Sequence, residues 1–215
     1  VTAGPTREYL DPVRYISNES SGKQGFEIAE ALSRLGIKTT LITGPSNLFS
    51  KKNIKTKKII TADEMFEAVK KCLPVDIAIC AAAVADFKPI KKSKSKIKKD
   101  NMKSKFIELK KNSDIVEFLG KNNKHRPSLV IGFAAETENL SKNAFSKLRE
   151  KNCDLIVVND VSKKDSGLNS DYNRVSIIDN SGKIKVIKKN KKSFIANVLA
   201  EIVLDKLLIN DRSFN

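Results

Sequence analysis

Short β-type apolar runs alternate with helical patterns along most of this chain of 215 residues. Residues 75–83 (VDIAICAAA), 128–135 (SLVIGFAA) and 154–158 (DLIVV) have the apolar character of buried strands. Segments with helical periodicity lie between such runs. A repeated strand–helix–strand order is typical of a parallel sheet covered by helices on both faces. The sequence therefore predicts an α/β fold that is Rossmann-like, doubly wound and mostly parallel.

The predicted helices carry their own start and stop signals. Residues 22–35 place apolar side chains at near-helical spacing, and Gly36 follows them as a C-cap glycine. Thr61 and Glu64 form the capping box of a helix that runs to about Cys72. Further helices are expected at residues 139–151 and 193–208, and further strands at residues 1–3, 38–43 and 54–60.

Two regions interrupt this alternation. Residues 86–111 contain eleven lysines and short alternating pieces such as KFIELK, which predict an inserted, Lys-rich β flap. Residues 174–187 are two alternating runs around the turn sequence Asn-Ser-Gly at 180–182, which predicts a C-terminal antiparallel hairpin. Because Val1–Ala3 resembles only the end of a strand, we expect further residues upstream.

The formal net charge of +16 favours an anionic partner, which would be a nucleic acid, a membrane surface or an acidic small molecule. The abundance of Lys, Asn and Ile throughout the chain also explains much of this charge as a matter of composition. No apolar run reaches the roughly 20 residues that cross a bilayer, and the first residues, VTAGPTREYL, have neither the basic n-region nor the apolar h-region of a signal peptide. We therefore expect no membrane partner and a cytoplasmic location.

Three widely spaced cysteines, Cys72, Cys80 and Cys153, lie in apolar surroundings. The only histidine is His125, so the spacing excludes a Cys/His metal cluster. We interpret the cysteines as buried free thiols.

Four segments follow predicted strands directly, at the edge where open α/β sheets bind ligands: TAGPTRE, AAAVADF, GFAAET and VVNDV. Between the first of these and the first helix lies RYISNESSGKQG, residues 14–25. It matches neither a Walker A loop nor a GxGxxG fingerprint. Ser20 and Ser21 are suited to cap the helix near Gly22, and the helix start together with Lys23 would favour a phosphate.

The words TAGPTREYLDPVRYISNESSGKQGFEIA, AAAVADF, KIKK, NSDIV, GFAAET and VVNDVS occur in this order along nearly the whole chain. In this the chain resembles the phosphopantothenoylcysteine synthetases, the ligase half of bacterial bifunctional coenzyme A biosynthesis flavoproteins. The resemblance implies one CoaB-type ligase domain over residues 1–215, with the flap at 86–111 inserted. It also implies an upstream decarboxylase domain, which would carry the FMN.

The reaction that the resemblance implies has two steps. The carboxylate of 4'-phosphopantothenate attacks the α-phosphate of CTP, and pyrophosphate leaves. The amine of cysteine then attacks the acyl-cytidylate, and CMP leaves. Mg²⁺ and lysines would offset the charge of the triphosphate. Members of the family are dimeric, so a homodimer is implied.

The resemblance also assigns site residues. Asn18 would hold the acyl-cytidylate through its amide, and Lys96, the first residue of KIKK, would be the catalytic lysine of the flap. Ser113 stands where the family usually has proline. No metal ligand is assigned. The nucleotide-binding positions are Gly4, Ala82, Asp86, Lys96, Ser113, Asp114, Ile115, Val116, Phe133, Lys147 and Lys151, and the substrate-binding positions are Arg14, Asn18 and Ala83.

Two other classes of function stay open at this point. The charge and the lysine flap are compatible with a nucleic-acid-binding module, but few aromatic residues and no binding motif accompany them, so we expect no nucleic-acid partner. A Rossmann-type oxidoreductase would bind a nicotinamide cofactor. Within the ligase interpretation, CTP is favoured over ATP only by similarity to the bifunctional type.

Overall fold

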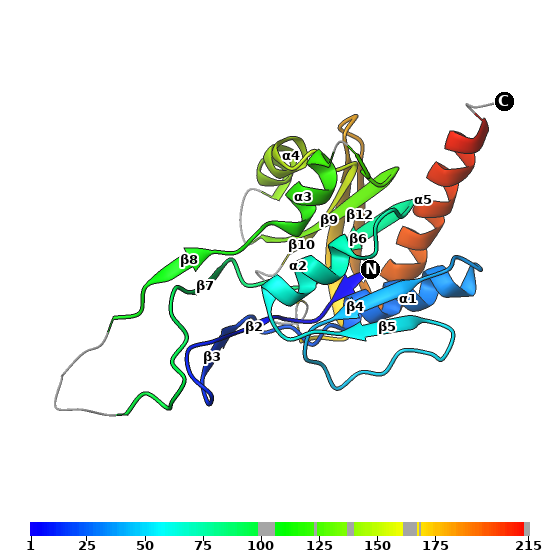
Figure 1. Ribbon diagram of the computed structural model, residues 1–215. Coiled ribbons are helices and arrows are strands. Elements are labelled where there is room, and N and C mark those ends of the chain that lie inside the picture. Colours follow the sequence, from blue (N-terminus) through cyan, green and yellow to red (C-terminus); the bar gives the residue numbers. More distant parts are fainter. Residues whose placement is uncertain (99–105, 123, 137–139, 161–166, 168, 213–215) are drawn as a thin grey trace.

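The computed structural model describes residues 1–98, 106–122, 124–136, 140–160, 167 and 169–212 (Figure 1). Within these ranges, one eight-stranded sheet has the order β12-β11-β10-β9-β6-β1-β4-β5. The strands from β10 to β5 pair in parallel, whereas β11 and β12 add an antiparallel hairpin at one edge. The predicted sheet and hairpin are confirmed. The bounds are β1 (Thr2–Ala3), β4 (Thr40–Thr43), β5 (Lys55–Lys58), β6 (Ile77–Cys80), β9 (Leu129–Glu136), β10 (Leu155–Asp160), β11 (Tyr172–Asp179) and β12 (Ile184–Lys191).

Helices cover both faces of the sheet (Figure 1). Alternate strand residues point to opposite faces, so Leu129 and Ile131 pack in one core cluster and Val130 in the other. Both faces of the central strands are therefore apolar, which explains their continuous apolar runs. One face is covered by α1 (Lys23–Arg34) and α5 (Lys192–Arg212), and the other by α2 (Ala62–Lys70), α3 (Ile115–Lys121) and α4 (Leu140–Glu150).

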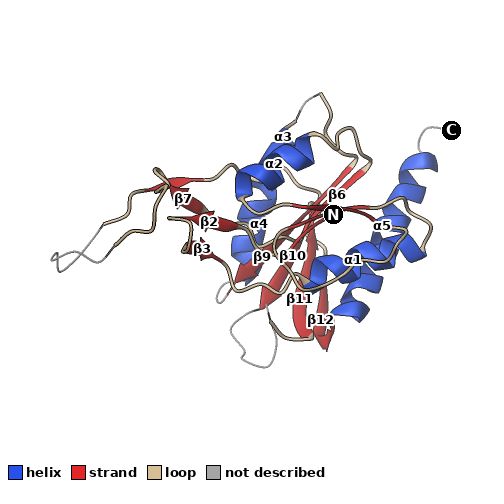
Figure 2. Ribbon diagram, turned by 60° about the horizontal axis from the view of Figure 1, so that its bottom comes forward, coloured by secondary structure: helices blue, strands red, loops and turns tan. Residues whose placement is uncertain are grey.

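Two small antiparallel pairs project from the same side of the molecule (Figures 1 and 2). The pair β2 (Arg7–Tyr9) and β3 (Tyr15–Ser17) is inserted between β1 and α1. The pair β7 (Phe87–Pro89) and β8 (Leu109–Lys111) forms the base of the flap, so the predicted inserted β arm is present. The flap residues 99–105 lie outside the described ranges.

The structure corrects some local expectations and confirms others. The N-cap of α1 is Gly22, with no side-chain cap, because the hydroxyls of Ser20 and Ser21 accept from the Gly22 and Lys23 N–H groups instead. Cys72 is only half-buried, although all three cysteines are free thiols. The capping role of Thr61 is confirmed, since its hydroxyl accepts from the Glu64 N–H at 3.2 Å. No helix in the described part of the chain combines the length and apolarity needed to cross a membrane.

Candidate active site at the carboxyl edge of the sheet

The loops after β1 and β6 are joined at the carboxyl edge of the sheet. The Ala83 N–H donates to the Gly4 carbonyl at 2.9 Å, and the Thr6 N–H donates to the Ala83 carbonyl at 3.3 Å. The Ala85 N–H donates to the Thr6 hydroxyl at 3.0 Å. Two of the segments that the strand-end rule selects therefore form one continuous wall, which contains the predicted positions Gly4, Ala82 and Ala83.

Three glycines let α1 start against this wall. Gly4 and Gly22 have φ values of 73° and 79°, which L side chains rarely adopt. A Cβ on Gly22 would lie 3.0 Å from the Gly4 Cα, and a Cβ on Gly25 would lie 2.5 Å from the Ala3 Cβ. In a dinucleotide fingerprint, glycines provide the tight turn, the close backbone approach and the helix–strand contact. Here these roles belong to glycines that the β2–β3 hairpin separates in sequence.

Asn18 lies between the hairpin and α1, and its side chain braces the wall. The amide nitrogen donates to the Ala83 carbonyl at 3.2 Å and to the Val84 carbonyl at 3.1 Å. Both amide hydrogens thus bind the loop after β6. Asn18 therefore lies beside the predicted substrate position Ala83, and its contact with a ligand stays a prediction.

A cleft of about 70 Å³ opens between the start of α1 and the ends of the strands. Of the predicted residues, Ala83 and Phe133 line it, whereas Lys147, Lys151 and residues 113–116 do not. Its lining combines backbone at a helix N-terminus, an aromatic ring, amides and cations, a set that suits a nucleotide. The lining residues are Ser20, Gly22, Lys23, Gln24, Ala81, Ala83, Phe133, Ala134, Ala135, Asn159, Gly167, Asn173 and Lys192.

Two lysines make the cleft basic. Lys23 pairs with Asp171 at 2.5 Å, and this pairing lowers the pKa of the Asp171 carboxyl. Lys192 is buried, and burial together with the nearby charge of Lys23 lowers the pKa of its ammonium to about 8. A bound anion would relieve the repulsion between the Lys23 and Lys192 ammonium groups.

The rear of the cleft holds a buried amide pair, in which Asn173 donates to the Asn159 Oδ1 at 3.1 Å. Gln24 donates to the Lys192 carbonyl at 3.2 Å, and its own Oε1 is buried with no partner among the described residues. Sequence reasoning named VVNDV, which contains Asn159, and RYISNESSGKQG, which contains Gln24, but missed Asn173 and Lys192. A hairpin residue and one lysine in a lysine-rich chain carry no distinctive signal.

The second group of predicted nucleotide-binding residues lies around the start of α3. Asp114 is the N-cap of α3, where its Oδ1 accepts from the Glu117 N–H at 3.0 Å. Its Oδ2 pairs with the Lys151 ammonium at 2.8 Å, directly after the end of α4. Burial opposes ionisation of Asp114, but the Glu117 N–H and Lys151 together lower its pKa. The structure thus joins Asp114 to Lys151, apart from the lining of the cleft.

Lys96 is exposed on the flap, next to a tight contact with the β2–β3 hairpin. The Arg14 guanidinium donates to the Ile97 carbonyl at 2.6 Å and to the Asp11 carboxylate. The predicted substrate residue Arg14 therefore binds the flap. Asp86, at the base of the flap, accepts through its carbonyl from the Asn112 N–H at 2.9 Å.

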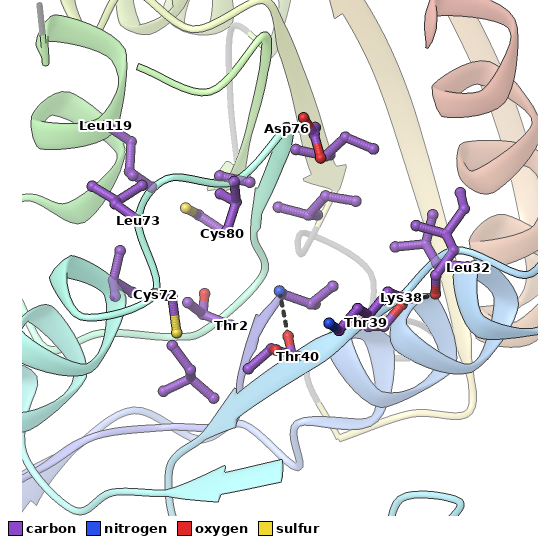
Figure 3. Close-up of a pocket in the computed structure, with 18 of the residues that line it drawn as sticks. Thr2, Leu32, Lys38, Thr39, Thr40, Cys72, Leu73, Asp76, Cys80 and Leu119 are labelled. Carbon is purple, nitrogen blue, oxygen red and sulfur yellow. Dashed lines mark hydrogen bonds between the residues drawn. The ribbon is translucent and has the colours of Figure 1, made fainter. Parts of the chain in front are cut away.

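A larger cavity of about 400 Å³ lies at the opposite, amino edge of the sheet (Figure 3). It lies beside Val1 between β4 and β6, and Thr40, Asp76 and Cys80 lie around it. None of the predicted site residues lines this cavity. Its size therefore does not make it the active-site candidate.

Residues 1–207 match the family described as the C-terminal domain of the DNA/pantothenate metabolism flavoprotein. The coenzyme A biosynthesis bifunctional protein CoaBC of Haemophilus influenzae is 44% identical over 204 residues, which are 94% of this chain and 50% of that protein. CoaBC of Escherichia coli K12 is 42% identical over 209 residues, 96% of this chain and 51% of that protein. The chain thus spans about half the length of these relatives.

Solved structures agree with this match. The crystal structure of the C-terminal domain of CoaBC is 36% identical, with a TM-score of 0.80, and the alignment covers 98% of this chain and 94% of that chain. A Cab2 variant in complex with phosphopantothenate-cysteine has a TM-score of 0.76 at 15% identity, covering 98% of this chain and 87% of that chain. The second likeness supports the fold alone.

Proposed function

The chain belongs to the family of DNA/pantothenate metabolism flavoprotein C-terminal domains, and from this premise we propose that it is a phosphopantothenate–cysteine ligase. It joins 4'-phosphopantothenate to cysteine in coenzyme A biosynthesis, through an acyl-cytidylate made from CTP. Residues 1–215 act as one ligase domain in the cytoplasm. The single observation that carries the proposal is the basic cleft at the glycine-lined start of α1.

In the first step, a carboxylate oxygen of 4'-phosphopantothenate attacks the α-phosphorus of CTP. The bond from that phosphorus to the bridging oxygen breaks, and pyrophosphate leaves with the bonding electrons. The start of α1 and the ammonium groups of Lys23 and Lys192 are suited to bind the phosphates. Phe133 offers a face for the base, and Lys96 would come from the flap to the developing charge.

In the second step, the cysteine amine attacks the acyl carbon, loses a proton, and displaces CMP. Asn18 supports this step by bracing the loop at Ala83 and Val84, which borders the cleft. The brace keeps the wall in place while the reactive anhydride is bound. Uncontrolled hydrolysis of the anhydride is reduced when its surroundings are held rigid and exclude water.

Mg²⁺ would neutralise charge on the triphosphate when bound. The described residues contain no group of three or more His, Cys, Asp or Glu side chains that would hold a metal ion by themselves. Mg²⁺ commonly binds through substrate phosphates and retained water, with only one or two carboxylates from the protein. An ion that enters bound to the phosphates of CTP would need few carboxylates from the protein.

The test is a nucleotide panel with purified protein. Pyrophosphate release is expected only when 4'-phosphopantothenate, CTP and Mg²⁺ are all present, and CMP release is expected only after cysteine is added. CTP should be used faster than ATP. Pyrophosphate release without the acid substrate, or no release under any condition, would refute the ligase proposal.

We propose further that the flap mediates a homodimer. Apolar side chains on its described parts are exposed, to 95% in Phe106 and 45% in Phe87. Exposed apolar patches of this kind commonly mark protein–protein contacts. Light scattering should give twice the mass of the chain, and a Phe106→Ser variant should shift the mass toward the monomer. A monomer at all concentrations would contradict this assignment.

A further inference from the structure

We propose that Asp11 is a positioning residue for the flap lysine Lys96, acting through the backbone of Ile97. The proposal rests on the proposed ligase function, in which Lys96 serves the first step. Asp11 lies in the turn of the β2–β3 hairpin and is fully buried at the contact between hairpin and flap. No role in catalysis or binding is otherwise assigned to it.

The two oxygens of this carboxylate bind different parts of the molecule. The Oδ1 accepts from the N–H groups of Val13 and Arg14, both at 2.8 Å, and so holds the hairpin turn. The Oδ2 accepts from the Ile97 N–H at 3.1 Å and from the Arg14 Nε and Nη2 at 3.0 and 2.6 Å. One oxygen therefore shapes the turn, whereas the other binds the flap.

Arg14 completes the contact from the other side of the same peptide. Its Nη2 donates to the Ile97 carbonyl at 2.6 Å, while the Asp11 carboxylate accepts from the Ile97 N–H. Both backbone groups of the residue after Lys96 are thus bound by one ion pair. A further bond, from the Ser93 N–H to the Leu10 carbonyl at 2.9 Å, fixes the flap three residues before Lys96.

The charge of Asp11 is secure at neutral pH. Burial by itself would raise the pKa of the carboxyl, but the Arg14 guanidinium and the N–H groups of Ile97, Val13 and Arg14 hold this pKa below its usual range. Charge-assisted hydrogen bonds are stronger than neutral ones. The contact therefore acts as a permanent anchor for the flap and not as a pH switch.

Asp11→Asn separates the two roles of the carboxylate. The amide oxygen can still accept from the turn, but the amide nitrogen would face the donors of Arg14 and Ile97 and cannot accept from them. The hairpin should keep its shape while the flap is released. Because small displacements of a reacting group are costly, we expect kcat for pyrophosphate release to fall roughly ten- to a hundredfold.

The decisive measurement is a double-mutant cycle with Lys96→Gln. Calorimetric CTP affinity should change little, since Asp11 is not part of the cleft lining. In the Lys96→Gln background, Asp11→Asn should lower kcat no further, because the lysine that it positions is absent. An equal loss in both backgrounds, or wild-type kcat in the single variant, would overturn the proposal.

A matched control and a second readout separate this result from failure of the ligase proposal. Asp63 also binds the flap, through Lys88 at 2.5 Å, but the Asp63 side chain is 60% exposed and the contact lies at the base of the flap, so Asp63→Asn should keep near-wild-type kcat. Trypsin should cut the flap lysines faster in Asp11→Asn than in Asp63→Asn, whether or not the protein is a ligase. Equal cleavage would refute the anchor itself, whereas an inactive wild-type protein would refute only the ligase function.

Discussion

The loop that carries Asn18 and the flap that carries Lys96 are attached to the domain in different ways. Asn18 is tied to the wall of the cleft by two hydrogen bonds, next to the glycine contacts that seat α1 on the sheet. Lys96 is exposed on a projecting arm whose described contacts run through Asp11, Arg14 and the β2–β3 hairpin. The loop of Asn18 is packed directly against the wall of the cleft, whereas the flap contacts the β2–β3 hairpin, which itself projects from the sheet.

This difference indicates a division of labour. A rigid wall suits a bound intermediate, because its dipoles need no rearrangement during the reaction. A projecting arm that is anchored beside Lys96 suits a charged group that serves one step without forming part of the wall. Substitutions in the two segments should therefore affect different measurable quantities.

Asn18→Asp should cause the largest loss. A carboxylate cannot donate to the carbonyls of Ala83 and Val84, and its charge would repel both these oxygens and the phosphates of a ligand. By analogy with the removal of a catalytic hydrogen-bond donor, turnover should fall by about two to three orders of magnitude. Steady-state assays measure this, with circular dichroism to verify the fold. Asn53→Asp is the control, because its amide is exposed, binds the Ser33 hydroxyl at 2.6 Å, and is not part of the cleft lining. Near-normal turnover in Asn18→Asp would reduce the residue to a brace without importance for catalysis.

Lys96→Gln should lower kcat by about a hundredfold, because a preorganised positive charge is lost from the first step. The protein should keep its CTP affinity and its unfolding midpoint, since Lys96 is exposed and outside the cleft lining. Rapid-quench measurement of pyrophosphate release isolates this step. Lys94→Gln removes an equivalent exposed charge from the same arm and should remain active. If both variants behave alike, the effect is general flap charge and not a specific lysine.

Gly25→Ala tests the rigid segment by stability. The added methyl group would lie 2.5 Å from the Ala3 Cβ and 2.9 Å from the Thr2 carbonyl oxygen, so α1 must move off β1. Overpacking of this kind costs about 1–3 kcal/mol of unfolding free energy. Urea denaturation measures it, with Glu27→Ala on the same helix as the control. An unchanged midpoint would show that the start of α1 is not rigidly packed against β1.

The general architecture was predictable because long-range packing and local pattern agree in it. Continuous apolar runs such as residues 128–135 became central strands, and the Asn-Ser-Gly turn at 180–182 became the turn between β11 and β12. Three short elements of the site region were missed. The strands β2 and β3 have three residues each, and α3 has seven, too few for a periodic signal.

The candidate site was predictable in location but only partly in composition. The strand-end rule selected the wall formed by Gly4 and Ala83, whose hydrogen bond confirms that the two segments meet. The approach of Gly22 to Gly4 depends on closure of the β2–β3 hairpin, which sequence spacing does not reveal. The catalytic roles of Asn18 and Lys96 come from the family resemblance and stay predictions.

The titration of Lys192, which lines the cleft, should have a small effect on CTP binding. Burial and Lys23 lower the pKa of its ammonium to about 8, with Asp171 acting in the opposite direction. The group is charged below this pH and becomes neutral as the pH rises through it, so an attraction to phosphate is lost on the alkaline side. The loss of one partly screened charge should weaken CTP binding by roughly fivefold between pH 7 and pH 9. Calorimetry at several pH values measures this, and Lys192→Met should bind at the weaker level throughout, whereas Lys188→Met should retain the pH dependence. CTP phosphates that were bound by the flap would not respond to the titration of the buried Lys192. A wild-type CTP affinity that does not change between pH 7 and pH 9 would therefore place the phosphate site at the flap and not at the start of α1.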